Sequence, residues 1–403
     1  MKLLCISKYS APPKYGVGSR LFYLANEFSN NGIDVTLVSS DSNHLANYPQ
    51  TDQIFNIEKI GNLNHIWIKT YKYNLSSSFK RLISWLDFDR KLFKLKFNKK
   101  TAPDVVIISS LSLTSILYGI HLKKKHNCKL IFEVRDIYPL TLTEELGFKK
   151  YHPLIVGFSM IEKKGYKNAD LIVGTMPNLS EHVFGLIKRN KEVFFSPLGI
   201  PEIWNREIII DSSLDCLFPK DKIIIGYAGS MSKSNALFSL MESIKIVESK
   251  NQNIHFVLVG DGETKTELEK LVCDNTNVTF GPKIQQKYIP YFLSKCDILY
   301  LSTHKSKVWQ YGQSMNKMID YMMSSKPIIA SYSGYQSMLN EAGSGVFVPV
   351  DSISEIVGSI INYSSMSNAD RSIIGKKGKE WIEINHNYKE ISKKYLDKII
   401  QIL

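Results

Sequence analysis

The sequence predicts an α/β protein of two domains, each built on a parallel β-sheet. Short apolar runs typical of buried strands alternate with helical patterns along the whole chain. This alternation begins at residues 2–7 and starts again at residues 223–228, after an irregular stretch that contains three prolines. A chain of 403 residues is also too long for one ordinary hydrophobic core. Because strand–helix alternation produces parallel sheets with right-handed crossovers, we expect two such sheets.

The elements follow one another in a regular order. After the first strand, residues 8–18 carry two prolines and two glycines, which marks a loop. Ser19 opens a helical pattern with four apolar residues on one face, and Gly32 ends it. Further strands are expected at residues 35–39, 104–109, 130–133, 171–173 and 193–195, and then at residues 223–228, 256–259, 278–280, 298–301 and 327–331.

We divide the chain into two Rossmann-like domains, residues 1–200 and 201–375, and a final helix, residues 376–403, that crosses back to the first domain. In parallel sheets, ligands bind beyond the carboxyl ends of the strands. Two facing sheets of this kind share an interdomain cleft, which is the expected site. The loops that follow the strands are therefore the places to search for functional residues.

The composition indicates a globular protein with an anionic partner. The hydrophobic fraction is 44%, and the net charge of +13 favours a phosphorylated substrate, a nucleic acid or an anionic membrane surface. The five cysteines lie far apart and form no CxxC motif, which is typical of free thiols in a reducing compartment. No signal peptide and no spanning helix are expected, because Met1 leads directly into a strand and no apolar window reaches about 18 residues.

Two glycine-containing loops occupy equivalent places, each after the first strand of a domain. Gly16 and Gly18 follow the first strand, and Gly229 follows residues 223–228. Glycine lets a backbone approach phosphate oxygens closely, and the N–H groups of a following helix favour anions. A tight turn explains the first loop about as well, and the missing third glycine argues against NAD. Lys233 can neutralise a pyrophosphate, with a surface lysine after a turn as the alternative.

A second polar loop, residues 312–317, runs into a helix and then into a β-branched strand. Ser314, Asn316 and Lys317 are expected at the helix N-terminus, where N–H groups point at anions. Asp320 follows one turn later and can bind a ribose or sugar hydroxyl. The alternative makes Asn316 a cap and Asp320 a surface charge. The glycines of residues 260–262 are interpreted as a turn that starts a helix with acidic residues in its first turn.

Arg135 and Asp136 follow the apolar strand at residues 130–133. Charges at a strand end are costly unless they are paired or functional. Arg135 can contact a phosphate, and Asp136 can orient a hydroxyl or act as a base. A purely structural Arg–Asp pair explains the two residues equally well.

Residues 79–100 combine eight basic residues with two aspartates and an apolar helical face. Basic residues with exposed aromatics suit an anionic membrane interface, and the candidates for this contact are Arg81, Trp85, Arg90 and Lys94. An ordinary helix with a solvated basic side is the alternative. Asp87 and Asp89 imitate a DxD metal motif, but no strand precedes them, so the match is interpreted as accidental.

The sequence contains no HExxH, GxxxxGK[ST] or GxSxG motif and no Cys/His metal cluster. A metal site and a Ser-His-Asp hydrolase are therefore not expected, and we predict no cofactor.

Taken together, these segments resemble family 4 glycosyltransferases of the GT-B fold, and more narrowly the bacterial N-acetyl-L-fucosamine transferases of O-antigen and capsule assembly. The resembling residues are 10–20, 133–139, 227–230, 259–262, 316–322 and 326–329. They span nearly the whole chain in the expected order.

The resemblance implies a hexosyltransferase that moves a sugar from a UDP-sugar to a saccharide on a polyprenyl diphosphate, with retention of configuration and without a metal. The first domain would bind the acceptor, with Arg135 and Asp136 as catalytic residues, and the second would bind the donor. Gly16 and Gly18 would face the donor phosphates, and Lys233 with residues 314–317 would grip the diphosphate. The protein would work in the cytoplasm, peripheral at the inner face of the bacterial membrane.

Four positions differ from the family pattern. Gly312 and Asp320 stand where the family carries the first and second glutamates of Glu-x7-Glu. Ser230 stands where an arginine is often found, and Arg135 where many members carry a histidine. These departures leave Lys233 and Lys317 to carry more of the phosphate charge.

Two other functions are consistent with the sequence. A hydrolysing UDP-GlcNAc 2-epimerase shares the two-domain architecture and the donor but needs no lipid acceptor. A nucleic-acid-binding protein would explain the positive charge, but the chain lacks interleaved aromatic platforms and any known binding module.

Overall fold

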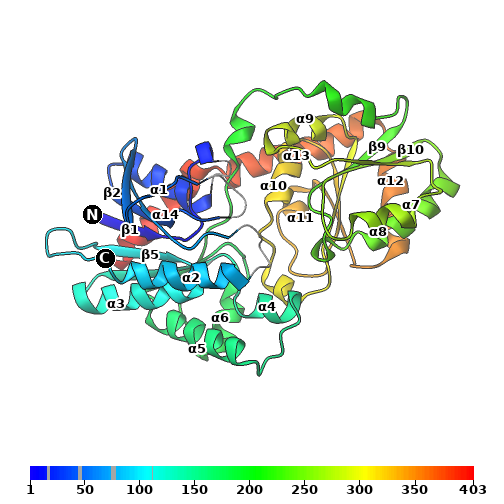
Figure 1. Cartoon of the computed structure of the whole chain (residues 1–403). Coiled ribbons are helices and arrows are strands. Elements are labelled where there is room, and N and C mark those ends of the chain that lie inside the picture. Colours follow the sequence, from blue (N-terminus) through cyan, green and yellow to red (C-terminus); the bar gives the residue numbers. More distant parts are fainter. Residues whose placement is uncertain (16–18, 44–47, 74–78, 111) are drawn as a thin grey trace. The chain divides into compact units, whose positions relative to one another are not determined.

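The computed structural model describes residues 1–15, 19–43, 48–73, 79–110 and 112–403. The chain forms two compact units (Figure 1). The first unit contains Met1–Gly199 and Tyr388–Leu403, and the second contains Ile200–Asn387.

The first unit is built on an eight-stranded sheet with the strand order β3-β4-β2-β1-β5-β6-β7-β8. Its strands are β1 (Lys2–Ile6), β2 (Asp34–Ser40), β3 (Phe55–Ile60), β4 (Leu63–Ile68), β5 (Val105–Ser109), β6 (Lys129–Val134), β7 (Leu171–Gly174) and β8 (Val193–Phe195). All neighbours are parallel except β3 and β4, which form an antiparallel pair. The parallel strands were predicted from their apolar runs, whereas the β3–β4 hairpin was not.

Helices cover both faces of this sheet (Figure 1). They are α1 (Arg20–Asn30), α2 (Phe79–Leu92), α3 (Ile116–His126), α4 (Leu140–Glu145), α5 (Pro153–Asn168), α6 (Leu179–Ile187) and α14 (Tyr388–Ile402). The predicted apolar face of α1 lies in the core, where Phe28 is fully buried. Tyr395 and Ile399 of α14 belong to the same core, and the Tyr395 ring meets the Phe28 ring edge-on at 5.6 Å. The last helix is therefore an integral part of the first unit.

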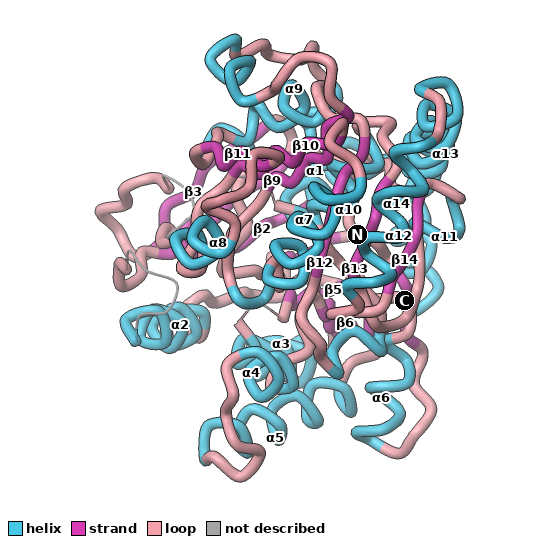
Figure 2. The backbone as a smooth tube through the Cα atoms, turned by 90° about the vertical axis from the view of Figure 1, so that its right-hand side faces the viewer, coloured by secondary structure: helices cyan, strands magenta, loops and turns pink. Residues whose placement is uncertain are grey.

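The second unit is built on a six-stranded sheet with the order β11-β10-β9-β12-β13-β14 (Figure 2). Its strands are β9 (Ile223–Ala228), β10 (Ile254–Val259), β11 (Val278–Gly281), β12 (Ile298–Ser302), β13 (Ile328–Ser331) and β14 (Gly345–Val348). Every neighbouring pair is parallel. The carboxyl ends of all six strands therefore meet at one edge, as the crossover rule predicts.

Helices also cover both faces of the second sheet. They are α7 (Phe238–Lys250), α8 (Lys265–Leu271), α9 (Ile289–Ser294), α10 (Asn316–Met323), α11 (Leu339–Ala342), α12 (Ile353–Ser365) and α13 (Asn368–Asn385). Helices α7, α8 and α12 share one apolar core with the strands. Helix α10 packs against α9 and α13. Short 3-10 helices occupy η1 (Pro13–Tyr15), η2 (Leu113–Ser115), η3 (Glu202–Asn205), η4 (Ser212–Leu217), η5 (Lys233–Asn235), η6 (Gln286–Tyr288) and η7 (Lys307–Tyr311).

The final helical pattern, expected as one helix over residues 376–403, is divided between two helices. Helix α13 starts earlier, at Asn368, and belongs to the second unit, while α14 belongs to the first. The break lies at His386 and Asn387, where the helical backbone stops. Among the described residues, no helix has both the length and the apolar character that crossing a bilayer requires.

Candidate functional site

The carboxyl edge of the second sheet gathers segments that are far apart in the sequence. Gly229 follows β9 directly and donates its backbone N–H to Val259 at the end of β10, at 3.1 Å. The Tyr321 hydroxyl of α10 accepts a hydrogen bond from the backbone N–H of Ala228 at 2.9 Å. Helix α10 is thereby fixed against the end of β9, which brings its N-terminal turn to this edge.

Lys317 is the cation that the fold places here. Its Nζ donates to the Tyr227 hydroxyl and to Asn235 Oδ1, both at 2.9 Å, and lies 4.2 Å from the centre of the Tyr227 ring. A Cβ atom added to Gly229 would lie 2.6 Å from the same nitrogen. The predicted donor-site residues Gly229 and Lys317 are therefore direct neighbours, and only glycine leaves room for the ammonium group.

Burial lowers the pKa of Lys317 from 10.5 to about 7. No carboxylate is among its hydrogen-bond partners in the described part of the chain. The fold therefore favours the neutral amine, and the unliganded protein gains stability from this group as the pH rises from about 7 towards 10.5. A polyanion beside Lys317 would restore the charge, which is the electrostatic property expected of a phosphate site.

A polar turn lines the other side of Lys317. Asn235 Nδ2 donates to Ser230 Oγ at 2.9 Å and to Ser232 Oγ at 3.0 Å. The side chain that meets Lys317 is therefore Asn235, two residues beyond the predicted Lys233. Lys233 itself is exposed, and its backbone N–H donates to Glu263 Oε1 at 3.4 Å. The sequence around Lys233 is rich in serine, which could have indicated a polar turn that includes Asn235, but the prediction selected only Lys233.

The N-terminus of α10 differs in detail from the prediction. Its N-cap is Met315, whose backbone N–H donates to the buried Gln313 side chain at 3.2 Å. Asn316 is the first residue of the helix and is exposed, so it is not the cap that the alternative interpretation expected. Ser314 lies half-buried in the preceding loop. Gly312 has a φ of +107°, a backbone conformation that residues with side chains rarely adopt, which accounts for glycine where the family has glutamate.

Asp320 is half-buried and bonded, so it is not the surface charge of the alternative interpretation. Its Oδ1 accepts a hydrogen bond from Trp204 Nε1 at 2.7 Å. Burial raises the pKa of Asp320 to about 6, and the bond from Trp204 opposes that rise. Trp204 was not predicted, because no local pattern connects residues so far apart in the sequence.

A cavity of about 340 Å³ opens beside Gly229 and Ser230. Its lining combines backbone groups, two charged side chains and aliphatic side chains: Gly229, Ser230, Val259, Gly260, Asp261, Gly262, Lys283, Ile284 and Ile289. The sequence analysis missed the residues that follow β11. Gly260 is more than a turn residue, since a Cβ atom there would lie 1.8 Å from the Gly229 carbonyl oxygen. The cavity has room and chemistry for a flat polar ring beside a phosphate site.

In the first unit, Arg135 and Asp136 lie directly after β6, at the carboxyl edge of that sheet. The Ser110 hydroxyl accepts the backbone N–H of Arg135 at 3.0 Å. Burial raises the pKa of the Asp136 carboxyl, and the charges of Arg135 and Arg81 oppose the rise. A carboxyl group with a raised pKa at a strand end has the properties of a general base.

The membrane face predicted for residues 79–100 is wrong for Trp85. Trp85 is only 8% exposed and donates its indole N–H to the Tyr9 hydroxyl. The half-buried Arg81 lies 5.1 Å from the Trp85 ring and also donates to Tyr9. Arg90 and Lys94 are exposed, but α2 ends at Leu92, so Lys94 lies beyond the helix. Trp85, Phe88 and Leu92 pack into the first unit, whereas Ile83 and Leu86 of the same helix stay exposed.

The Asp87-x-Asp89 match is structural, as expected. Asp89 is buried and accepts hydrogen bonds from the hydroxyl groups of Ser112, Thr114 and Ser115. Within the described ranges, no three His, Cys, Asp or Glu side chains are grouped to hold a metal ion. The predicted donor residues Gly16 and Gly18 lie outside the described residues.

Comparison with known proteins assigns the second unit to a family. Residues 222–365 match the family model described as "Glycosyl transferases group 1". The second unit carries a glycosyltransferase group 1 domain. Gly229, Asn235, Lys317 and the cavity all lie within the matched residues of this glycosyltransferase domain. No curated protein matches the sequence.

Solved structures match the whole chain. Sucrose-phosphate synthase from Thermosynechococcus elongatus is similar with a TM-score of 0.75 at 16% identity, covering 100% of this chain and 98% of that chain. An E. coli structure described as "Trehalose-6-phosphate … bound with UDP-2-fluoro glucose" has a TM-score of 0.73 at 13% identity, with both chains fully covered (100%). HepE from Anabaena in complex with UDP and glucose has a TM-score of 0.65 at 12% identity, again covering 100% of each chain.

These similarities confirm the predicted fold, an α/β GT-B architecture with two Rossmann-like sheets. The match of residues 222–365 to the glycosyltransferase model supports the predicted enzyme class, a glycosyltransferase.

Proposed function

We propose that the protein transfers a sugar, an N-acetylated deoxyhexose, from a UDP-sugar to a polyprenyl-diphosphate-linked saccharide during the synthesis of O-antigen or capsule. The observation that carries the donor half of this proposal is the contact between Lys317 and Gly229 at the carboxyl edge of the second sheet. A half-buried cation beside a glycine, at the start of a helix, is suited to a diphosphate.

The cavity beside this contact is the proposed binding site of the nucleotide base. Its aliphatic residues Ile284 and Ile289 can hold a base, and Asp261 with neighbouring backbone groups can bond its edge. Two proteins with similar structures are described as bound to UDP-2-fluoro glucose and to UDP and glucose. Both observations support a uridine nucleotide.

The proposed reaction breaks the bond between the sugar and the diphosphate. Negative charge gathers on the departing diphosphate, and Lys317 with the N–H groups that begin α10 would stabilise it. In the first unit, Asp136 would take the proton of the acceptor hydroxyl, and Arg135 would contact an acceptor phosphate. The raised pKa of Asp136 supports its role as a base. Retention of configuration and the absence of a metal from the mechanism follow from the family resemblance.

The acceptor is proposed from charge and from the same resemblance. A net charge of +13 favours an anionic partner, and a polyprenyl diphosphate at the inner face of the membrane supplies that charge. The resemblance to N-acetyl-L-fucosamine transferases supports the sugar and the O-antigen or capsule product.

A two-step experiment tests this function. UDP-, GDP- and dTDP-sugars are first screened for thermal stabilisation of the purified protein, and UDP-sugars should raise the melting temperature most. The best donor is then incubated with and without a polyprenyl-diphosphate-linked acceptor. Product that requires the acceptor supports the transferase, whereas product from UDP-GlcNAc alone would favour the epimerase. Salt-sensitive binding of nucleic acid without any nucleotide-sugar binding would overturn the proposal.

Donor binding is also expected to take up a proton above neutral pH. Because Lys317 has a pKa of about 7 in the free protein, its amine is mostly neutral at about pH 8. A diphosphate raises that pKa, so the complex gains a proton; at about pH 6 the lysine is already charged and the uptake disappears. Titration calorimetry in two buffers of different ionisation enthalpy measures the uptake. A heat independent of the buffer at about pH 8 would contradict this role of Lys317.

A further inference from the structure

Residues 146–167 of the first unit expose a series of apolar and basic side chains. We call these residues, from the loop after α4 to the last turn of α5, the α5 surface. They belong neither to the donor site nor to the Arg135–Asp136 edge described above, and their exposed side chains are not part of the core.

The loop part of the α5 surface exposes two large apolar residues. Leu146 is 66% exposed and Tyr151 is 74% exposed. Lys149 and Lys150 are exposed between them, and the Lys149 ammonium lies 5.8 Å from the Tyr151 ring. In this loop the exposed apolar side chains are grouped and alternate with cations, a composition that suits an interaction surface.

The helical part continues the pattern along one stripe of α5. The exposed residues recur at helical spacing and lie on one face, with the apolar ones first and the basic ones after: Val156, Met160, Lys163, Lys164 and Lys167. Met160 is 68% exposed and Val156 is 46% exposed. The opposite face of α5 carries the buried Phe158 and Tyr166, which pack on the sheet. Packing against the core explains the buried face of α5, but it does not explain the apolar residues Val156 and Met160 on the exposed face.

The charge of the α5 surface is entirely positive. Glu162 is the one acidic residue between positions 146 and 167, and it is buried, with its carboxylate bonded to His182 at 2.7 Å and to Tyr166 at 3.1 Å. All five lysines of the α5 surface are exposed. An anionic partner would therefore meet no exposed carboxylate within this segment.

The exposed part of α2 differs in charge. Leu86 and Ile83 are exposed there too, at 56% and 38%. However, Asp87 pairs with both Arg90 and Lys91, at 3.1 Å and 2.7 Å, which cancels part of the positive charge. Both surfaces therefore expose apolar side chains. They differ in that the exposed charged residues of the α5 surface are all lysines, whereas α2 pairs its basic residues with Asp87.

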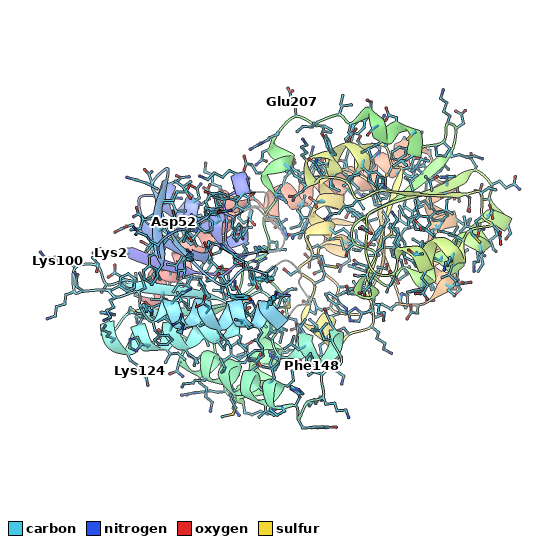
Figure 3. All side chains as sticks on the ribbon, viewed as in Figure 1. Lys2, Asp52, Lys100, Lys124, Phe148 and Glu207 are labelled. Carbon is cyan, nitrogen blue, oxygen red and sulfur yellow. The ribbon has the colours of Figure 1, made fainter. Side chains whose placement is uncertain are left out.

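The path of the chain places the loop of the α5 surface near Arg135 and Asp136, where the acceptor is proposed to bind. Strand β6 ends at Val134, Arg135 and Asp136 follow, and the chain then forms α4 and the loop that opens α5. That loop therefore lies at the carboxyl edge of the first sheet. Figure 3 shows Phe148 of the loop and Lys100 at opposite ends of the first unit.

We propose that the first unit rests on an anionic lipid bilayer through the α5 surface, with Leu146, Tyr151 and Met160 entering the interface and the lysines binding headgroup phosphates. Apolar side chains ringed by lysines, with no acidic residue among them, match such an interface in both hydrophobicity and charge. This inference rests on the proposed function, because contact with the bilayer would bring a lipid-linked acceptor next to Arg135 and Asp136.

Sedimentation of the full chain with lipid vesicles tests the proposal. Vesicles of phosphatidylcholine mixed with phosphatidylglycerol are compared with vesicles of phosphatidylcholine alone. Two variants alter the α5 surface, one in charge (Lys163→Gln with Lys164→Gln) and one in apolar character (Tyr151→Ser with Met160→Ser). A matched control, Leu86→Ser with Lys80→Gln, makes changes of the same kinds on α2. Each variant is checked for an unchanged melting temperature.

The wild-type chain and the α2 control are expected to bind the mixed vesicles. The charge variant should bind about thirtyfold more weakly, because each of its two lysines contributes about 1 kcal/mol at an anionic surface. The apolar variant should also bind more weakly, because it removes two apolar side chains from the interface. Wild-type binding that does not depend on phosphatidylglycerol would overturn the proposal. So would α5 variants that bind like the wild type, or a loss confined to the α2 control.

Stabilisation of the same variants by UDP-sugars separates the two proposals. That readout reports donor binding, to which no residue of the α5 surface is assigned, so the donor half of the proposed function can fail while vesicle binding succeeds, and the reverse.

Discussion

Replacing Lys317 by alanine is expected to lower sugar transfer by about one hundred- to one thousandfold, as the loss of one preorganised donor to a developing anion does, equivalent to about 2.7–4 kcal/mol in barrier. The ammonium group is held by Tyr227 and Asn235 and lies against Gly229, which fixes it at the carboxyl edge of the second sheet. Initial rates with the purified variant and the best UDP-sugar measure the effect.

The fold should tolerate this change. The buried lysine is disfavoured in its charged form, so its removal leaves no unpaired ion behind. The matched control is Lys250→Ala, an exposed lysine in the last turn of α7, which should keep wild-type rates. Near-native turnover of Lys317→Ala would remove Lys317 from the mechanism.

Replacing Gly260 by alanine is expected to damage both the second unit and its donor site. Gly260 has a φ of +150°, and an added Cβ would lie 1.8 Å from the Gly229 carbonyl oxygen. Strain of this kind costs on the order of 1–3 kcal/mol before any clash is counted. Because the clashing atom is backbone, relief would move Gly229 away from Lys317. Thermal unfolding should show a lower melting temperature, with little further rise when a UDP-sugar is added.

Gly358→Ala is the control for this glycine. Gly358 lies in α12, and a Cβ atom there would have no neighbour within 4 Å. Its melting temperature should stay the same or rise slightly, since alanine favours helix. Equal melting temperatures for the two variants would show that the backbone contact at Gly260 is not rigid.

The architecture could be predicted from the sequence because its signals are local. Buried parallel strands appear as short apolar runs, and glycine or proline marks their ends. The β3–β4 hairpin escaped prediction because residues 55–68 mix polar and apolar positions without a clear run. The role of Trp85 in α2 was mispredicted for another reason: periodicity identifies apolar residues but does not say which of them meet the core, as Trp85 does, and which stay exposed, as Leu86 does.

The site could be predicted only in part, because its contacts are long-range. Lys317 and Gly229 were each selected for their place after a strand or at a helix start, and the crossover rule then brought them to one edge. Trp204 carries no such local signal, and Asn235 lies in a serine-rich turn from which only Lys233 was selected. The residues that line the cavity after β11 follow a strand as well, but their aliphatic side chains gave no chemical reason to select them.

The position of α14 has a consequence for how the chain is made. Tyr395 and Ile399 complete the core around Phe28, yet the ribosome produces them only after all of Ile200–Asn387. The amino-terminal half must therefore wait, with apolar surface of α1 uncovered, while the carboxyl-terminal half emerges and folds. The first unit, although most of it is synthesised first, can therefore complete its core only after the second unit has been synthesised.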